Sequence, residues 1–106
     1  MNNFTDMLSK AKAMQDKMRE AQEKIKKIEA EGEAGGNLVK VILTGDYELK
    51  SIIISDEAKK EDQEIINDLI KAAYNNAKDS LKKKSAEELS KVTGGLDLPS
   101  DFKLPF

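Results

Sequence analysis

The chain has 106 residues, of which 36% are charged, yet its formal net charge is only −2, so overall charge neither favours nor excludes a polyanionic partner. It contains no cysteine and no histidine, which excludes disulfide frameworks, thiolate or imidazole metal sites and Ser/His or Cys/His catalysis. We therefore expect no enzymatic activity, no cofactor, no metal site and no small-molecule substrate. The first residues do not resemble a signal peptide, and no apolar run could cross a bilayer, so we expect a cytoplasmic protein without a membrane partner.

An apolar stripe marks the first third of the chain. Its members recur in alternating steps of three and four residues: Phe4, Met7, Ala11, Met14, Met18, Ala21, Ile25 and Ile28. This heptad seam predicts a helix from about Phe4 to Ile28, ending near Glu29, that packs along a partner helix. The helix should be about 35 to 40 Å long. Because the rest of the chain is short, we expect the partner to be a second copy of the molecule.

Three strands are expected next. Residues 38–44 and 47–54 are rich in β-branched side chains and are joined at Gly45 and Asp46, a pair suited to a tight hairpin. The polar stretch 29–34 is predicted to be a short edge strand that leads into a turn at residues 35–37, with its charges discouraging unwanted pairing. The sequence thus predicts a three-stranded antiparallel sheet.

A second long helix should follow from about Glu61 to Val92. Its apolar residues, Ile65, Ile66, Leu69, Ile70, Ala73, Ala77 and Leu81, form a broad face suited to covering the sheet. The capping-box sequence at 85–88 suggests that this helix breaks and restarts there. Gly94 and Gly95 should end it, so we expect one α+β domain over residues 1–95 and an extended tail over 96–106. Both helices outreach so narrow a sheet, which predicts projecting arms.

The order of these elements and four local strings resemble the YbaB/EbfC family of bacterial nucleoid-associated DNA-binding proteins. The strings are residues 14–18 (MQDKM), 36–41 (GNLVKV) with Gly45, 72–77 (AAYNNA) and 98–106 (LPSDFKLPF). The resemblance implies an α-β-β-β-α protomer and a homodimer shaped like tweezers. It also implies binding of double-stranded DNA in the bacterial nucleoid, with effects on DNA conformation and gene expression, and it implies no enzymatic activity.

Basic side chains on both helices are the candidate DNA contacts. Residues 1–28 carry seven basic and four acidic side chains, whereas residues 56–68 carry six carboxylates against two lysines. We expect phosphate contacts rather than base reading, because the chain has a single arginine. The candidates are Lys10, Lys12, Lys17, Arg19, Lys24, Lys78, Lys82, Lys83 and Lys84. A plain solvated helix face explains the same residues about equally well.

Dimer contacts are expected along the seam and in the sheet, at Met14, Met18, Ala21, Ile25, Val39 and Val41. An alternative function is a small protein-interaction adaptor or chaperone whose methionine-bearing arms hold an apolar client. An enzyme that uses carboxylates, lysines, hydroxyls or its two tyrosines is a distant third. Glu61, Glu64 and Asp68 share a helix face, but a solvated N-terminal turn explains them better than a metal site.

Overall fold

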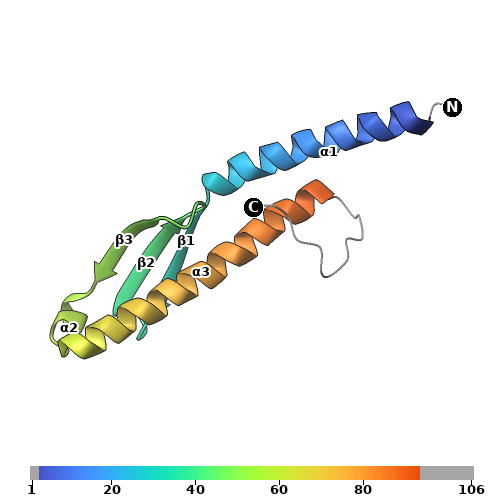
Figure 1. Cartoon of the computed structure of the whole chain (residues 1–106). Coiled ribbons are helices and arrows are strands. Elements are labelled where there is room, and N and C mark those ends of the chain that lie inside the picture. Colours follow the sequence, from blue (N-terminus) through green and yellow to red (C-terminus); the bar gives the residue numbers. More distant parts are fainter. Residues whose placement is uncertain (1–2, 94–106) are drawn as a thin grey trace.

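Six elements make up residues 3–93, the part of the chain that the computed structural model describes (Figure 1). They are α1 (Asn3–Lys26), β1 (Glu29–Ala34), β2 (Val39–Thr44), β3 (Leu49–Ile54), the short helix α2 (Asp56–Lys59) and α3 (Gln63–Thr93). The predicted α-β-β-β-α order is confirmed. The molecule is elongated, with principal extents of 72 × 24 × 18 Å.

The three strands form one antiparallel sheet in the order β1-β2-β3. The turn between β1 and β2 uses Gly35 and Gly36, whose positive φ angles of 65° and 74° suit residues without a Cβ. Between β2 and β3 the register shifts at Ile42 and Leu43, which marks a β-bulge next to the hairpin. The polar stretch predicted as an edge strand is β1.

Helix α3 covers one face of this sheet. Every second residue of β1 and β2 is buried beneath it: Ala30, Gly32, Ala34, Val39, Val41 and Leu43. Across from them lie Ala73, Ala77 and Leu81 of α3, which are fully buried. A Cβ built on Gly32 would lie 2.1 Å from the backbone nitrogen of Ala77 and 2.2 Å from the carbonyl oxygen of Ala73. Helix and strand therefore touch backbone to backbone, which only small residues allow.

Helix α1 packs on α3 rather than on the sheet, and the two helices project together from one end of the molecule (Figure 1). Ala21 and Ile25 are buried, and Met14 and Met18 are half-buried. Within the protomer, α3 thus covers this part of the seam, and the expected packing of a second copy along α1 stays a prediction. Helix α3 has 31 residues, so it runs past the sheet and provides the partner helix itself.

Three details differ from the sequence prediction. Helix α1 ends at Lys26, and Lys27 N and Ile28 N close its last turn on the carbonyl oxygens of Lys24 and Ile25. Helix α2 was not predicted; the hydroxyl of Ser55 caps it by accepting from Ala58 N. Helix α3 does not break at Ser85, a half-buried residue that lines a pocket together with Gln22 and Ile25 of α1. The predicted tail, 96–106, and Gly94–Gly95 lie outside the described residues.

Candidate nucleic-acid interface

Charge is divided between the two ends of the molecule. We call α1, Lys27 and residues 82–93 of α3 the arm, and residues 28–81 the sheet end. The arm carries eleven basic and six acidic side chains, whereas the sheet end carries six basic and twelve acidic ones. A nearly neutral chain is therefore a strong dipole, and a polyanion would be attracted to the arm and repelled by the sheet end.

The basic residues of α1 form two rows, each with a spacing of seven residues. One row is Lys10, Lys17 and Lys24, and the other is Lys12, Arg19 and Lys26. Seven residues are nearly two helical turns, so members of a row share a face and are about 10.5 Å apart along the axis. The first row flanks the seam that packs on α3, and the second lies on the opposite side of α1.

The two rows differ in their ion pairing. Arg19 of the second row forms a salt bridge of 2.5 Å with Asp16. Within residues 3–91, no salt bridge involves Lys10, Lys17 or Lys24. Lys12 and Lys26 have none either in this range, so the two rows differ in ion pairing only at Arg19. All members of the first row are exposed.

A shallow groove between α1 and α3 adds a further cation to the first row. Its lining residues are Lys17, Glu20, Ala21, Lys24, Glu88 and Lys91. Lys91 Nζ lies 3.2 Å from a carboxylate oxygen of Glu88. The sequence alone did not single out Lys91, and its spacing of seven from Lys84 was the one available signal.

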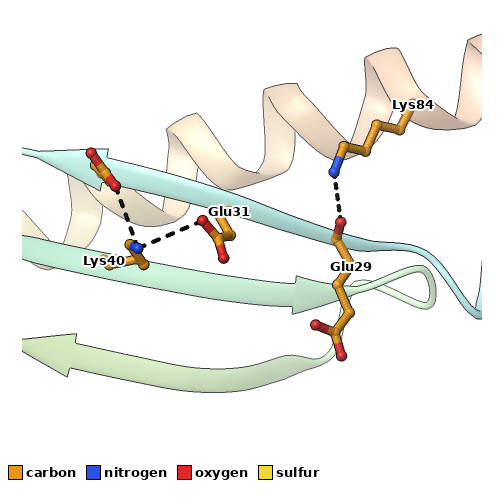
Figure 2. A network of polar contacts seen from close by, with 5 residues as sticks. Glu29, Glu31, Lys40 and Lys84 are labelled. Atoms are coloured by element: carbon orange, nitrogen blue, oxygen red, sulfur yellow. Dashed lines mark hydrogen bonds and ion pairs between the residues drawn. The ribbon is translucent and has the colours of Figure 1, made fainter.

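The three adjacent lysines of α3 are separated by the helix. Lys82 and Lys83 are exposed, and their positions differ by about 100° around the axis. Lys84 turns toward the sheet, where its Nζ donates to the backbone carbonyl of Glu29 at 2.8 Å (Figure 2). Lys78 is half-buried on the part of α3 above the sheet. The candidate residues of α3 thus do not form one patch.

Lysines of the sheet are neutralised locally. Lys40 Nζ lies 3.7 Å from Glu31 and 3.6 Å from Glu33 (Figure 2), and Lys50 pairs with Glu29. These pairs cover the sheet face opposite α3, where the glutamates of β1 leave an acidic surface. This face is unsuited to contact with phosphates.

The predicted dimer residues lie mostly inside the protomer. Val39 and Val41 are fully buried beneath α3, and Ala21 and Ile25 are buried beside it. Only Met14 and Met18 keep part of their surface exposed. Direct contact of the four buried side chains with a second copy would require the protomer to open, and their role in dimerisation stays a prediction.

Exposed apolar surface gathers instead around β3. Leu49, Ile52 and Ile53 are 50%, 40% and 51% exposed. A groove of about 330 Å³ separates β3 from α3, with Leu49, Ile52, Ile70 and Tyr74 among its lining residues. Helix α3 thus covers β1 and β2 but leaves the apolar side chains of β3 largely open.

Residues 3–93 contain neither a clustered metal site nor a membrane-spanning helix. Within them, no group of three or more carboxylates is placed to hold a metal ion, and Glu61, Glu64 and Asp68 belong to no such group. No described helix is long and apolar enough to span a membrane.

Comparisons with known proteins agree on one family. The model of the YbaB/EbfC DNA-binding family matches residues 1–96. A protein of Granulibacter bethesdensis is 44% identical over 107 aligned residues, and one of Rickettsia typhi is 43% identical, each with full coverage of both chains. Both are named nucleoid-associated protein. The crystal structure of an uncharacterized Helicobacter pylori protein has a TM-score of 0.71 at 21% identity, covering 87% of this chain and 98% of that one, so it shares the fold.

Proposed function

This chain belongs to the YbaB/EbfC DNA-binding family, and on that premise we propose that it binds double-stranded DNA as a homodimer, mainly through phosphate contacts. Its relatives carry the name nucleoid-associated protein, which supports a place in the bacterial nucleoid. There the protein alters DNA conformation and so contributes to nucleoid organisation and gene regulation. The family is named for DNA binding and not for catalysis.

The observation that carries the proposal is the uncompensated charge of the arm. Lys10, Lys17 and Lys24 are exposed and have no salt bridge among the described residues, whereas Lys40 and Lys50 of the sheet are paired. A phosphate backbone gains most from cations that no carboxylate already neutralises. The acidic sheet end points away from DNA, so binding has one preferred orientation.

Sequence-independent contact follows from the type of side chain. Lysine is a flexible point charge that suits phosphate, whereas bidentate reading of guanine favours arginine. Arg19 is the single arginine, and Asp16 already occupies its guanidinium. Any sequence preference should therefore come from DNA shape and deformability.

The two rows of α1 provide a matched test. One triple variant replaces Lys10, Lys17 and Lys24 by glutamine, and the other replaces Lys12, Arg19 and Lys26. Both remove three charges at the same spacing from the same helix, on opposite faces. We expect the first variant to lose more affinity for a duplex of mixed sequence. The slope of its log Kd against log[salt] should fall by about 0.9 for each phosphate that the variant no longer neutralises.

The titration should be made at two salt concentrations, with circular dichroism as the control for folding. Equal losses of affinity in the two variants would mean that only the total charge matters. That result would contradict the proposal that the helix face with Lys10, Lys17 and Lys24 contacts DNA. An affinity that does not depend on salt would contradict phosphate binding altogether.

Dimerisation is proposed through β3. Two carbonyl oxygens on the outer edge of β1 are already occupied, because Lys84 Nζ donates to Glu29 O and Asn76 Nδ2 donates to Glu33 O, both at 2.8 Å. The edge of β3 has no such cover within the described residues, and an apolar edge strand is a template for pairing. A second copy placed there buries Leu49, Ile52 and Ile53 and doubles the number of cationic arms, which raises avidity.

Sedimentation of two single variants locates the interface. Ile53→Lys places a charge on the exposed edge strand, and Met7→Lys places one on the exposed end of α1 as the matched control. We expect Ile53→Lys to give a folded monomer and Met7→Lys to leave the dimer intact. Dissociation by Met7→Lys alone would show that the interface lies along the apolar seam of α1 and not at β3. An unmodified protein that is monomeric at micromolar concentration would contradict the homodimer proposal.

A further inference from the structure

The turn that joins β2 and β3 touches the base of α1. A Cβ built on Gly45 would lie 1.7 Å from the carbonyl oxygen of Ile25, 2.6 Å from the carbonyl carbon of Ile25 and 2.9 Å from Lys26 Cα. Gly45 is buried, and its φ lies outside the left-handed region. Glycine is therefore needed here for the close approach of α1 and not for its backbone angle. A hydrogen of Gly45 Cα points at the oxygen of Ile25, which is a weak contact between the two backbones.

Helix α1 leaves the sheet end of the molecule beside the β2–β3 turn (Figure 1). We propose that Gly45 is a positioning residue for DNA binding: through its contact with Ile25, the turn sets the direction in which α1 projects and so the place of Lys10 and Lys17. The position of α1 is a property of the protein alone, whereas its effect on DNA rests on the function proposed above. The two parts can therefore be tested separately.

The turn is the stiffer side of this contact. Thr44 N donates to Glu48 O and Tyr47 N donates to Thr44 O, both at 2.9 Å, and Glu48 N donates to the hydroxyl oxygen of Thr44 at 3.2 Å. The carbonyl group of Ile25 cannot rotate aside without losing a bond, since it accepts from Ile28 N at 3.0 Å. A side chain added at the glycine of the turn is therefore expected to displace the end of α1 as a body.

The far part of α1 can follow such a displacement. Phe4, Met7 and Leu8 are 70%, 66% and 56% exposed, so few packing contacts hold this part of the helix. A cavity of about 390 Å³ adjoins the base of α1, between the β2–β3 turn and the residues Ser85 and Leu89 of α3. This cavity leaves room for the end of α1 to move.

The length of α1 enlarges a small shift at its base. The built Cβ and Ile25 O must separate by about 1.5 Å to reach a normal contact distance. The pivot is Ala21, which is 2% exposed and lies where α1 packs on α3. Ile25 and Thr5 lie about 6 Å and 24 Å from Ala21 along the helix axis, so a shift of about 1.5 Å at the base becomes about 6 Å at Thr5. Phosphates of one DNA strand are about 3.4 Å apart along the axis, and the far lysines would lose their register with them.

The distance between two spin labels tests the position of α1. The native chain contains no cysteine, so the labels are attached to Thr5→Cys at the far end of α1 and to Ala86→Cys on α3, two exposed positions. Dilution with excess unlabelled protein restricts the measurement to distances within one protomer. Gly45→Ala is compared with Gly36→Ala, which changes a glycine in the other turn of the sheet, where a built Cβ meets no atom within 4 Å. This control accounts for a general loss of stability.

We expect a single narrow distance distribution in the labelled protein with its native glycines and the same distribution in Gly36→Ala. In Gly45→Ala the maximum should shift by about 3 to 6 Å. A distribution in Gly45→Ala that matches the native one would overturn the proposal, because the turn and not α1 would then have given way. A broad distribution with the native glycines would also overturn it, since α1 would not be held at its base. That second measurement decides even if Gly45→Ala does not fold.

Titration of a duplex of mixed sequence tests the consequence for DNA. At about 0.1 M salt the loss of one phosphate contact lowers affinity about fivefold to tenfold. We therefore expect Gly45→Ala to bind at least about fivefold more weakly and Gly36→Ala to bind as the unmodified protein does. A displaced α1 with unchanged affinity would overturn the role of Gly45 in DNA binding. Absence of DNA binding by the unmodified protein would contradict the proposed function instead, and the spin labels would still decide whether Gly45 positions α1.

Discussion

The contact between Gly32 and α3 gives the sharpest test of the fold. In Gly32→Ala the new Cβ would lie 2.1 Å from Ala77 N, 2.2 Å from Ala73 O and 2.7 Å from Ala77 Cα. All three are backbone atoms, so no side-chain rotation can relieve the overlap. Helix α3 must instead move away from β1 by more than about 1 Å to reach normal contact distances.

The cost should lie at or above the upper end for overpacking, about 3 kcal/mol. At about 4 to 8 °C per kcal/mol for a domain of this size, the melting temperature should fall by roughly 12 to 24 °C. Urea denaturation followed by circular dichroism gives the free energy of unfolding directly. Protein concentration must be held constant, because the proposed dimerisation would contribute to the apparent stability.

Gly36→Ala is the control for the loss of glycine itself. Its φ is +74°, but no atom lies within 4 Å of a Cβ built there, so only the left-handed backbone is penalised, by about 1 to 2 kcal/mol. If Gly32→Ala destabilises no more than Gly36→Ala, the backbone-to-backbone packing of α3 on β1 is refuted.

Three smaller effects should be measurable in the same urea assay. Tyr47 has a φ of 63°, so Tyr47→Gly should relieve backbone strain of about 1 kcal/mol. The greater conformational entropy of glycine in the unfolded chain offsets this gain, so stability should stay unchanged or rise slightly. A loss above about 1 kcal/mol would show that packing of the tyrosine ring stabilises the fold. Ser55→Ala removes the cap on Ala58 N and should cost about 1 kcal/mol, and an unchanged midpoint would mean that α2 does not depend on its cap. Lys84→Met keeps the side-chain stem but loses the bond to Glu29 O, so it should cost about 1 kcal/mol with little change in DNA affinity; the reverse result would make Lys84 a DNA contact.

Much of the fold could be predicted because local patterns determine it. The β-branched runs around Gly45 and Asp46 predicted β2 and β3, and the apolar face of residues 65–81 predicted the helix that covers them. β1 was predicted as a polar edge strand that leads into a glycine turn, and in the structure its charged and small residues alternate between the two sides of the sheet. Alternation cannot show why the inward residues must be small. That requires knowing that Ala73 and Ala77 bring the helix backbone against the strand.

The partner of α1 could not be predicted, because a heptad seam shows that a helix is needed but not which one. Burial of Ala21 and Ile25 by α3 depends on how far α3 overruns the sheet. The extent of α3 was predicted closely, but the capping box at residues 85–88 suggested a break within it. Ser85 is half-buried and lines one pocket with Gln22 and Ile25 of α1, and the helix continues through it.

The candidate site was predictable in composition but not in arrangement. The positive charge of residues 1–28 was visible in the sequence, and so was the acidity of residues 56–68. Which lysines stay available for contact with DNA depends on tertiary contacts. Lys84 donates a hydrogen bond to the backbone of β1, whereas Lys91 lines one groove together with Lys17 and Lys24. No local rule distinguishes Lys83 from Lys84, although they are adjacent.

The bonds from Asn76 and Lys84 to two carbonyl oxygens of β1 bear on the size of the assembly that we propose. A sheet with two open borders can add copies without end and grow into a ribbon, whereas a sheet with one sealed border can accept a single neighbour. If two copies pair through β3 as proposed, these two bonds would hinder further strand addition at β1. Two side chains on a helix would thus act against polymerisation of a protein with an isoleucine-rich border.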